Sequence, residues 1–107
     1  MPRYVYQASY TAESVATLIN HPEDRIEAVT PAFKAMNAEI VVGGFPFGEH
    51  DILVIYDAPD DITAAALSLA IAAGGAVRSG KTTRLLTARE WVDSLQKAQG
   101  SQYKPAR

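Results

Sequence analysis

Five consecutive apolar residues, Ile52-Leu53-Val54-Ile55-Tyr56, set the first limit on the fold. A strand that is apolar on both sides needs cover on both faces, so it belongs inside a sheet rather than at its edge. Turn-forming residues stand on either side, with Gly48 and Asp51 before the segment and Asp57-Ala58-Pro59-Asp60 after it. We therefore expect a central strand at 52–56 that is entered through a hairpin connection at 47–51.

Three further segments have the pattern of strands. In residues 3–10 one side of the chain carries Tyr4, Tyr6, Ala8 and Tyr10, which is the alternation typical of a strand. Residues 39–47 contain two glycines and a proline, which favour an edge strand or a bulge. Residues 77–87 also have strand character, so four strands are predicted.

The first crossover contains helical patterns. Thr11 can cap a helix whose apolar stripe ends at Ile19. Pro22 suits the first turn of a second helix, which extends to Met36. Pro31 lacks the N–H that the carbonyl group of Glu27 needs, so we expect a kink, or a break at which Thr30 caps a new short helix.

Two more helices are predicted in the second half of the chain. Asp60 is a good N-cap for the alanine-rich residues 62–73, and Gly74-Gly75 should end that helix. Thr87 and Glu90 form a capping-box pattern before a last helix, which carries the apolar residues Trp91, Val92 and Leu95.

The order of these elements matches the α+β ferredoxin-like plan, βαββαβ, in which helices cover one face of a four-stranded antiparallel sheet. The other face is then bare. Small proteins of this plan commonly cover it with a second copy, so we expect a homodimer or a larger homo-oligomer.

A chain of 107 residues is the size of one domain, which we assign to 1–99, with a polar and frayed tail at 100–107. The net charge of −2 argues against nucleic acid or an anionic membrane as partner. There is no cysteine, and the first residues lack the apolar run of a signal peptide. A cytoplasmic location is predicted.

Residues 75–82 match the phosphate-binding pattern G-x-x-x-x-G-K-[ST], with Lys81 and Thr82 at its end. A true phosphate loop follows a strand and opens a helix, whereas here a helix precedes the motif and an extended segment follows it. We therefore reject a nucleotide hydrolase. In this interpretation the glycines end a helix or mark a bulge, and Lys81 is a solvated charge.

Three groups of side chains are candidates for a site. His50 lies between two carboxylates and can act as a general base, or simply pack in the turn. The tyrosines of 3–10, with Tyr56, can line a pocket for a flat ligand or belong to the core. Arg84, on the same strand face as Arg78, can hold an anion or be a solvated charge. From these groups we select Tyr6, His50 and Arg84 as ligand-binding candidates and His50 as a catalytic candidate.

Residues 47–54, the alanine-rich stretch 60–73, Gly75-Ala76-Val77-Arg78 and Thr82-Thr83 together resemble the GYD-domain family of small bacterial proteins. The resemblance extends from Tyr4-Val5 to Leu86-Thr87. It implies a ferredoxin-like fold of the dimeric α/β-barrel type and supplies no catalytic residues. The family usually has Gly-Glu-Tyr-Asp at the turn where this chain has His50.

The leading functional hypothesis is a homo-oligomeric module, without cofactor or metal, that binds a small molecule or assists another protein. The alternative is an enzyme that resembles small cofactor-independent monooxygenases acting on planar aromatic substrates. In that enzyme Tyr6 would stack on the substrate, His50 would transfer a proton and Arg84 would orient an anionic group. A third hypothesis is a subunit that only assembles.

Overall fold

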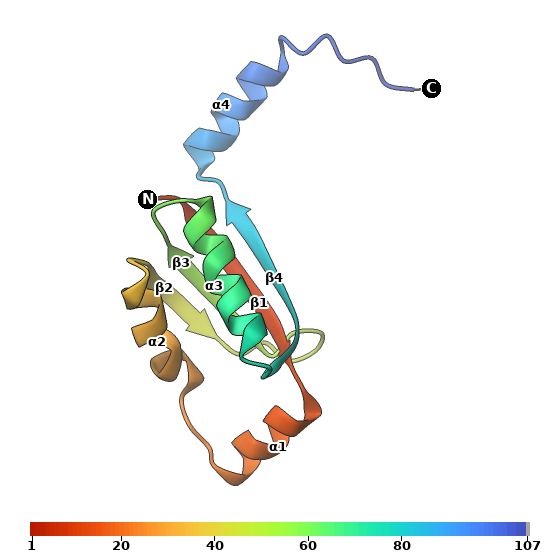
Figure 1. Cartoon of the computed structure of the whole chain (residues 1–107). Coiled ribbons are helices and arrows are strands. Elements are labelled where there is room, and N and C mark those ends of the chain that lie inside the picture. The colour runs from red at the N-terminus through yellow and green to blue at the C-terminus, as the bar shows by residue number, and fades with distance from the viewer. Residues whose placement is uncertain (107) are drawn as a thin grey trace.

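Four strands form one antiparallel sheet in the computed structural model of the chain, which describes residues 1–106 (Figure 1). The strands are β1 (Arg3–Tyr10), β2 (Glu39–Gly44), β3 (Ile52–Asp57) and β4 (Val77–Leu85). Their order across the sheet is β2-β3-β1-β4, so the apolar segment at 52–56 lies in an interior strand, as predicted.

The sheet has the connectivity of the predicted plan. β3 pairs antiparallel with both β1 and β2, so β1 and β2 run parallel to each other with β3 between them. β1 in turn pairs antiparallel with β4 and separates it from the parallel β3. Each helical crossover therefore joins two parallel strands across a third, which confirms the α+β ferredoxin-like class.

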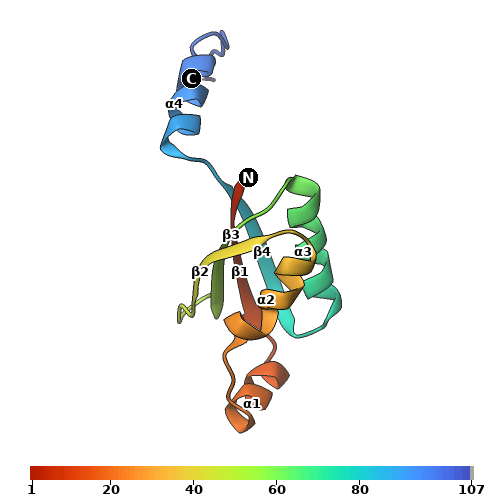
Figure 2. The same cartoon turned by 90° about the vertical axis from the view of Figure 1, so that its left-hand side faces the viewer.

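The helices are α1 (Ala12–Asn20), α2 (Arg25–Ala35), α3 (Asp61–Ala73) and α4 (Ala88–Ala98). α2 and α3 lie on the same face of the sheet, and within residues 1–106 the opposite face carries no helix (Figure 2). α1 lies beyond one end of the sheet and α4 beyond the other (Figure 1). Within residues 1–106, none of these helices is both long and apolar enough to cross a membrane.

The second helix differs from the prediction in its start and in its continuity. It begins at Arg25 because the Asp24 carboxylate accepts the backbone N–H groups of Ile26 and Glu27. Pro31 lies inside one uninterrupted helix, and the Thr30 hydroxyl donates to the Ile26 carbonyl oxygen at 2.7 Å. The prediction that Pro31 would split the helix, with Thr30 as a new cap, is therefore wrong.

Two strands are shorter than predicted. β2 ends at Gly44 instead of residue 47, and β4 ends at Leu85 instead of residue 87. Thr87 leaves the sheet because its side chain caps α4, accepting the Glu90 N–H at 3.1 Å. β2 lies at the edge of the sheet, one of the two predicted alternatives, and its register with β3 shifts between Ile40 and Val42.

The connection from β2 to β3 is fastened to the end of β1. The Ser9 hydroxyl donates to the Glu49 carbonyl oxygen at 2.6 Å, and the Asp51 carboxylate accepts the Tyr10 N–H at 2.9 Å. Gly48 has a φ of +137°, a value that side chains rarely tolerate. Turn geometry therefore accounts for Gly48, Glu49 and Asp51.

The core lies between the sheet and helices α2 and α3. Tyr4 and Tyr56 are opposite each other on β1 and β3, and their rings stack with centroids 5.4 Å apart. Phe33 of α2 meets the Tyr56 ring edge-on at 5.0 Å. Tyr4 and Tyr56 are 2% and 1% exposed, so this pair belongs to the core, one of the two alternatives left open for the tyrosines.

The bare face of the sheet has a half-exposed apolar centre. Because Tyr4, Tyr6 and Ala8 point to the helices, the alternating residues of β1 point away from them. The apolar side chains of this opposite face are Val5, Val42, Leu53, Ile55 and Leu85. At its rim Arg3 and Asp57 form a two-pronged ion pair, with N–O distances of 2.8 and 3.1 Å.

Candidate functional site

A cavity of about 270 Å³ lies among β1, β3, α2 and α3. Its walls are mostly apolar, with Val29 and Phe33 from α2, Val54 from β3 and Ile71 from α3. Tyr6, Tyr10 and Arg25 are the lining residues with polar side-chain groups. A concave apolar space with a few convergent polar groups is the usual form of a small-molecule site. We call this space the interhelix cavity.

Tyr6 is held in place by the neighbouring strand. It faces the helices from β1, and Ala8 beside it on the same face pairs with Gly80 of β4. A β-carbon at Gly80 would lie 2.8 Å from the Tyr6 hydroxyl oxygen, so only glycine leaves room for the phenol there. Burial raises the pKa of the Tyr6 hydroxyl, which therefore resists ionisation more strongly than an exposed phenol.

Tyr10 and Arg25 supply the polar end of the cavity. Burial raises the pKa of the Tyr10 phenol, while the Arg25 guanidinium acts in the opposite direction. Arg25 is half-buried at the first position of α2, and its Nη1 donates to Glu23 at 2.9 Å. The phenol therefore stays a neutral donor next to a cation.

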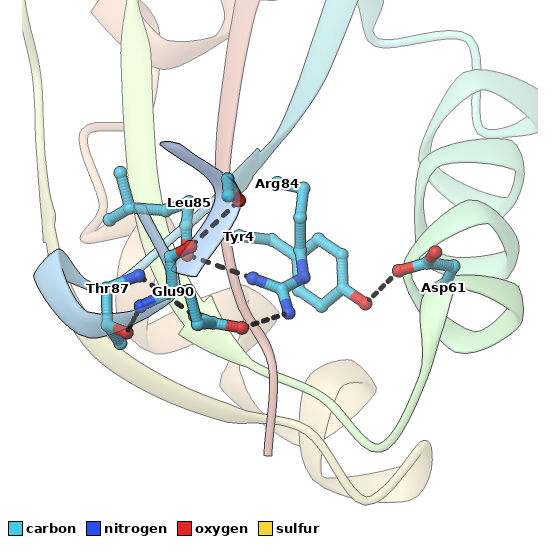
Figure 3. Close-up of polar contacts among 7 residues, drawn as sticks. Tyr4, Asp61, Arg84, Leu85, Thr87 and Glu90 are labelled. Atoms are coloured by element: carbon cyan, nitrogen blue, oxygen red, sulfur yellow. Dashed lines mark hydrogen bonds and ion pairs between the residues drawn. The ribbon is translucent and has the colours of Figure 1, made fainter. Parts of the chain in front are cut away.

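Arg84 does not reach the interhelix cavity. Its guanidinium lies 5.9 Å from the centre of the Tyr4 ring and donates to the Leu85 carbonyl oxygen and to the Glu90 carboxylate, at 3.1 and 3.0 Å (Figure 3). The Arg84 guanidinium and the Thr87 backbone N–H lower the pKa of Glu90 to about 2. Arg84 therefore anchors the first turn of α4 to the sheet. Its guanidinium, which was predicted to orient an anionic ligand, is hydrogen-bonded to Leu85 and Glu90 of the same chain.

His50 lies at the opposite end of β1 from Arg84. Arg84 is paired with Tyr4 near the start of the strand, whereas Asp51, the neighbour of His50, binds the N–H of Tyr10 at its end. Six residues of strand span about 20 Å. In the part of the chain that the structure describes, Tyr6, His50 and Arg84 are therefore not brought into one cavity, and only Tyr6 lines the space between the helices.

The phosphate-loop motif lies between a helix and a strand, the arrangement for which a phosphate loop was rejected. Gly74 ends α3, Gly75 has a φ of +78°, and Val77–Leu85 is strand β4 instead of a helix. Lys81 pairs with Gln7 in the sheet and is exposed. Among residues 1–106, no three His, Asp or Glu side chains are grouped so that they can hold a metal ion.

The sequence interpretation missed Arg25, Val29 and Ala70 as cavity residues. The periodicity of α2 did indicate that Val29 and Phe33 share a buried face. Nothing in the local pattern indicates that Arg25 lies beside Tyr10, since the two meet only because α2 packs across the end of β1. Of the tyrosines of β1, Tyr4 lies in the core, Tyr6 is buried in the core and also lines the cavity, and the partly buried Tyr10 lines the cavity.

The buried phenols predict a loss of stability in alkali. Burial, assisted at Tyr4 by the hydrogen bond to Asp61, raises the pKa of Tyr4 and Tyr56 to about 12. In the unfolded chain these groups ionise near pH ~10. As the pH rises, the unfolded state therefore loses these protons before the folded state does. The contribution of the two phenols to the free energy of unfolding is complete below pH ~10 and is lost as the pH rises towards 12.

Urea unfolding across this range, followed by circular dichroism, measures the effect. Tyr4→Phe should reduce the slope of the free energy of unfolding against pH, although it also removes the hydrogen bond to Asp61. An unchanged slope in Tyr4→Phe would contradict the assignment of Tyr4 as a buried ionising group.

Comparison with protein families gives a match. A family model described as GYD domain matches residues 4–95, a span that includes most of α4 and all of the sheet except Arg3. No curated protein matches the chain.

Proposed function

The chain belongs to the GYD domain family, and on this premise we propose that it is a homo-oligomeric module that binds a small, flat, mainly apolar molecule in the interhelix cavity. The observation that carries the proposal is the cavity itself, an apolar space of about 270 Å³ with polar groups from three lining residues. Its volume is just below the ~300–1,000 Å³ typical of sites for drug-sized ligands, so the ligand is small.

Indole is a suitable neutral probe for this proposal, because it is flat and apolar with one polar N–H. A ligand at 100 times its dissociation constant stabilises the folded state by about 2.7 kcal/mol, so indole should raise the melting temperature of the protein. Ala70→Phe places a phenyl ring at the cavity wall and should remove the rise. Differential scanning fluorimetry measures both.

The matched control is Ala73→Phe, which adds the same ring to the same helix at an exposed position outside the lining. This variant should keep the response to indole. Equal responses in wild type and Ala70→Phe, or no response in wild type at millimolar indole, would refute binding in the cavity.

The homo-oligomer is supported by two apolar surfaces. One is the bare sheet face, centred on the partly exposed Val5 and Ile55. The other is the stripe of α4, where Trp91, Val92 and Leu95 are all exposed. Apolar patches of this kind on a small protein mark interaction surfaces. A second copy packed against the sheet face would cover the first of them.

Ile55→Lys should dissociate the oligomer. Ile55 stands between Val5 and Val42 at the centre of the bare face, and an unpaired charge buried there costs about 3–5 kcal/mol. Light scattering during gel filtration should give a dimer or larger mass for wild type and a monomer for the variant. Ile62→Lys, at an exposed position of α3, should leave the mass unchanged. A monomeric wild type at micromolar concentration would refute the proposal.

A further inference from the structure

The interhelix cavity is polar at one end only. Tyr10, Arg25, Gly74 and Ala76 line it and also line a second hollow that opens towards α1. These shared residues mark the mouth of the cavity, where β1 ends, α2 begins and α3 ends. The remaining walls are apolar except for Tyr6. A ligand that fits this space has one polar end and an apolar body.

The single charge in the cavity lining is positive. Among residues 1–106, Arg25 is the charged residue of the cavity lining, and no carboxylate lines the cavity. Glu23, which accepts a hydrogen bond from Nη1 of Arg25, lines the outer hollow instead and is half-exposed. Asp51 is engaged with the backbone N–H of Tyr10. The guanidinium has five N–H donors, so the bond to Glu23 leaves others for a ligand.

The Tyr10 hydroxyl adds a neutral donor at the same mouth. An arginine and a phenol side by side match the two oxygens of a carboxylate, and a hydrogen bond to a charged group is about twice as strong as one between neutral groups. A phosphate monoester matches less well, because it would bring about two charges to a single, already paired guanidinium.

We infer that the interhelix cavity selects a small carboxylate with a flat apolar body, whose carboxylate binds Arg25 and the Tyr10 hydroxyl while the body packs between Val29 and Ile71. The inference rests on the proposed function and adds the chemical class of the ligand. Charge is the discriminating feature, because an uncharged molecule of the same shape offers the half-buried guanidinium only a neutral acceptor, whose hydrogen bond is weaker than that of a carboxylate.

Benzoate and benzamide test the inference, because they share size and shape and differ in charge. Isothermal titration calorimetry should show benzoate binding ~10-fold more tightly than benzamide. Arg25→Gln should weaken benzoate binding ~10-fold and leave benzamide within ~2-fold. Arg89→Gln, on the exposed side of α4, should change neither. Melting temperatures of all variants show whether Arg25→Gln still folds, and Tyr10→Phe is a second variant that should also weaken benzoate.

The outcomes separate this inference from the proposed function. If both probes bind equally, and Ala70→Phe abolishes both, the cavity binds small molecules but the selection of a carboxylate is refuted. If neither probe binds to wild type at millimolar concentration and indole also fails, both proposals fall. Preference for benzoate that is lost in Arg25→Gln and kept in Arg89→Gln supports the inference.

Discussion

Tyr56→Ala should destabilise the protein by about 3–5 kcal/mol, as truncation of a large buried aromatic residue does. The Tyr56 ring is 1% exposed, stacks on Tyr4 and meets the edge of Phe33, so its removal leaves a hole between the sheet and α2. Domains are stabilised by about 5–15 kcal/mol in total, so the variant should be largely unfolded at moderate urea. Equilibrium urea unfolding followed by circular dichroism measures the change.

Tyr56→Phe is the matched control, because it keeps the ring and removes only the hydroxyl. Both ring contacts of Tyr56 remain in this variant, so its free energy of unfolding should stay within about 1 kcal/mol of wild type. A loss of similar size in Tyr56→Phe and Tyr56→Ala would show that the hydroxyl, rather than ring packing, holds the core together.

Gly80→Ala should destabilise the protein by about 1–3 kcal/mol, the usual cost of overfilling a packed site. The new methyl group would lie 2.8 Å from the Tyr6 hydroxyl oxygen and 3.3 Å from two ring carbons, and Tyr6 is buried, so the ring must move into the cavity. The affinity for a cavity ligand should fall with the stability. Urea unfolding measures the first effect and calorimetry the second.

Because of this clash, the effects of substitutions at Gly80 and Tyr6 on stability should not be additive. In a Tyr6→Phe background the atom nearest to the new methyl group is absent. Gly80→Ala should therefore cost at least about 0.5 kcal/mol less in that background than in the wild-type protein. Gly44→Ala is the control, since a β-carbon there meets nothing within 4 Å, and it should change stability by at most about 0.5 kcal/mol. Additive effects of Gly80→Ala and Tyr6→Phe would contradict the contact.

The helix caps show why part of the fold follows from local sequence. Thr11, Asp60 and Thr87 each accept a backbone N–H from the first turn of the helix that follows, as their patterns predict. These bonds join residues three apart in the chain, so no distant contact decides them. Pro31 is the counterexample. Its local pattern predicts a kink or a break, and the break is absent, since α2 stays continuous while Phe33, two residues on, is packed on Tyr56.

The candidate site was predictable only in part. The alternation of β1 places Tyr6 and Tyr10 on one face, but it does not say that Tyr4 is covered while its neighbours border a cavity. Arg84 is a charged strand residue by sequence, and its partner Glu90 lies on a helix whose direction the sequence does not give. His50 was selected for its neighbours in the chain, and those neighbours, Glu49 and Asp51, hold the turn against β1.

Periodicity, caps and turns by themselves determined the order of strands and helices and hence the ferredoxin-like class, because these signals arise from hydrogen bonds and side-chain directions within a few residues. The interhelix cavity and its polar mouth were decided by the tertiary structure alone. Tyr10 and Arg25 lie on elements separated by α1, and the gap between α2 and α3 depends on how each packs on the sheet. No local interaction fixes that spacing, so a site built across it is visible only in the folded chain.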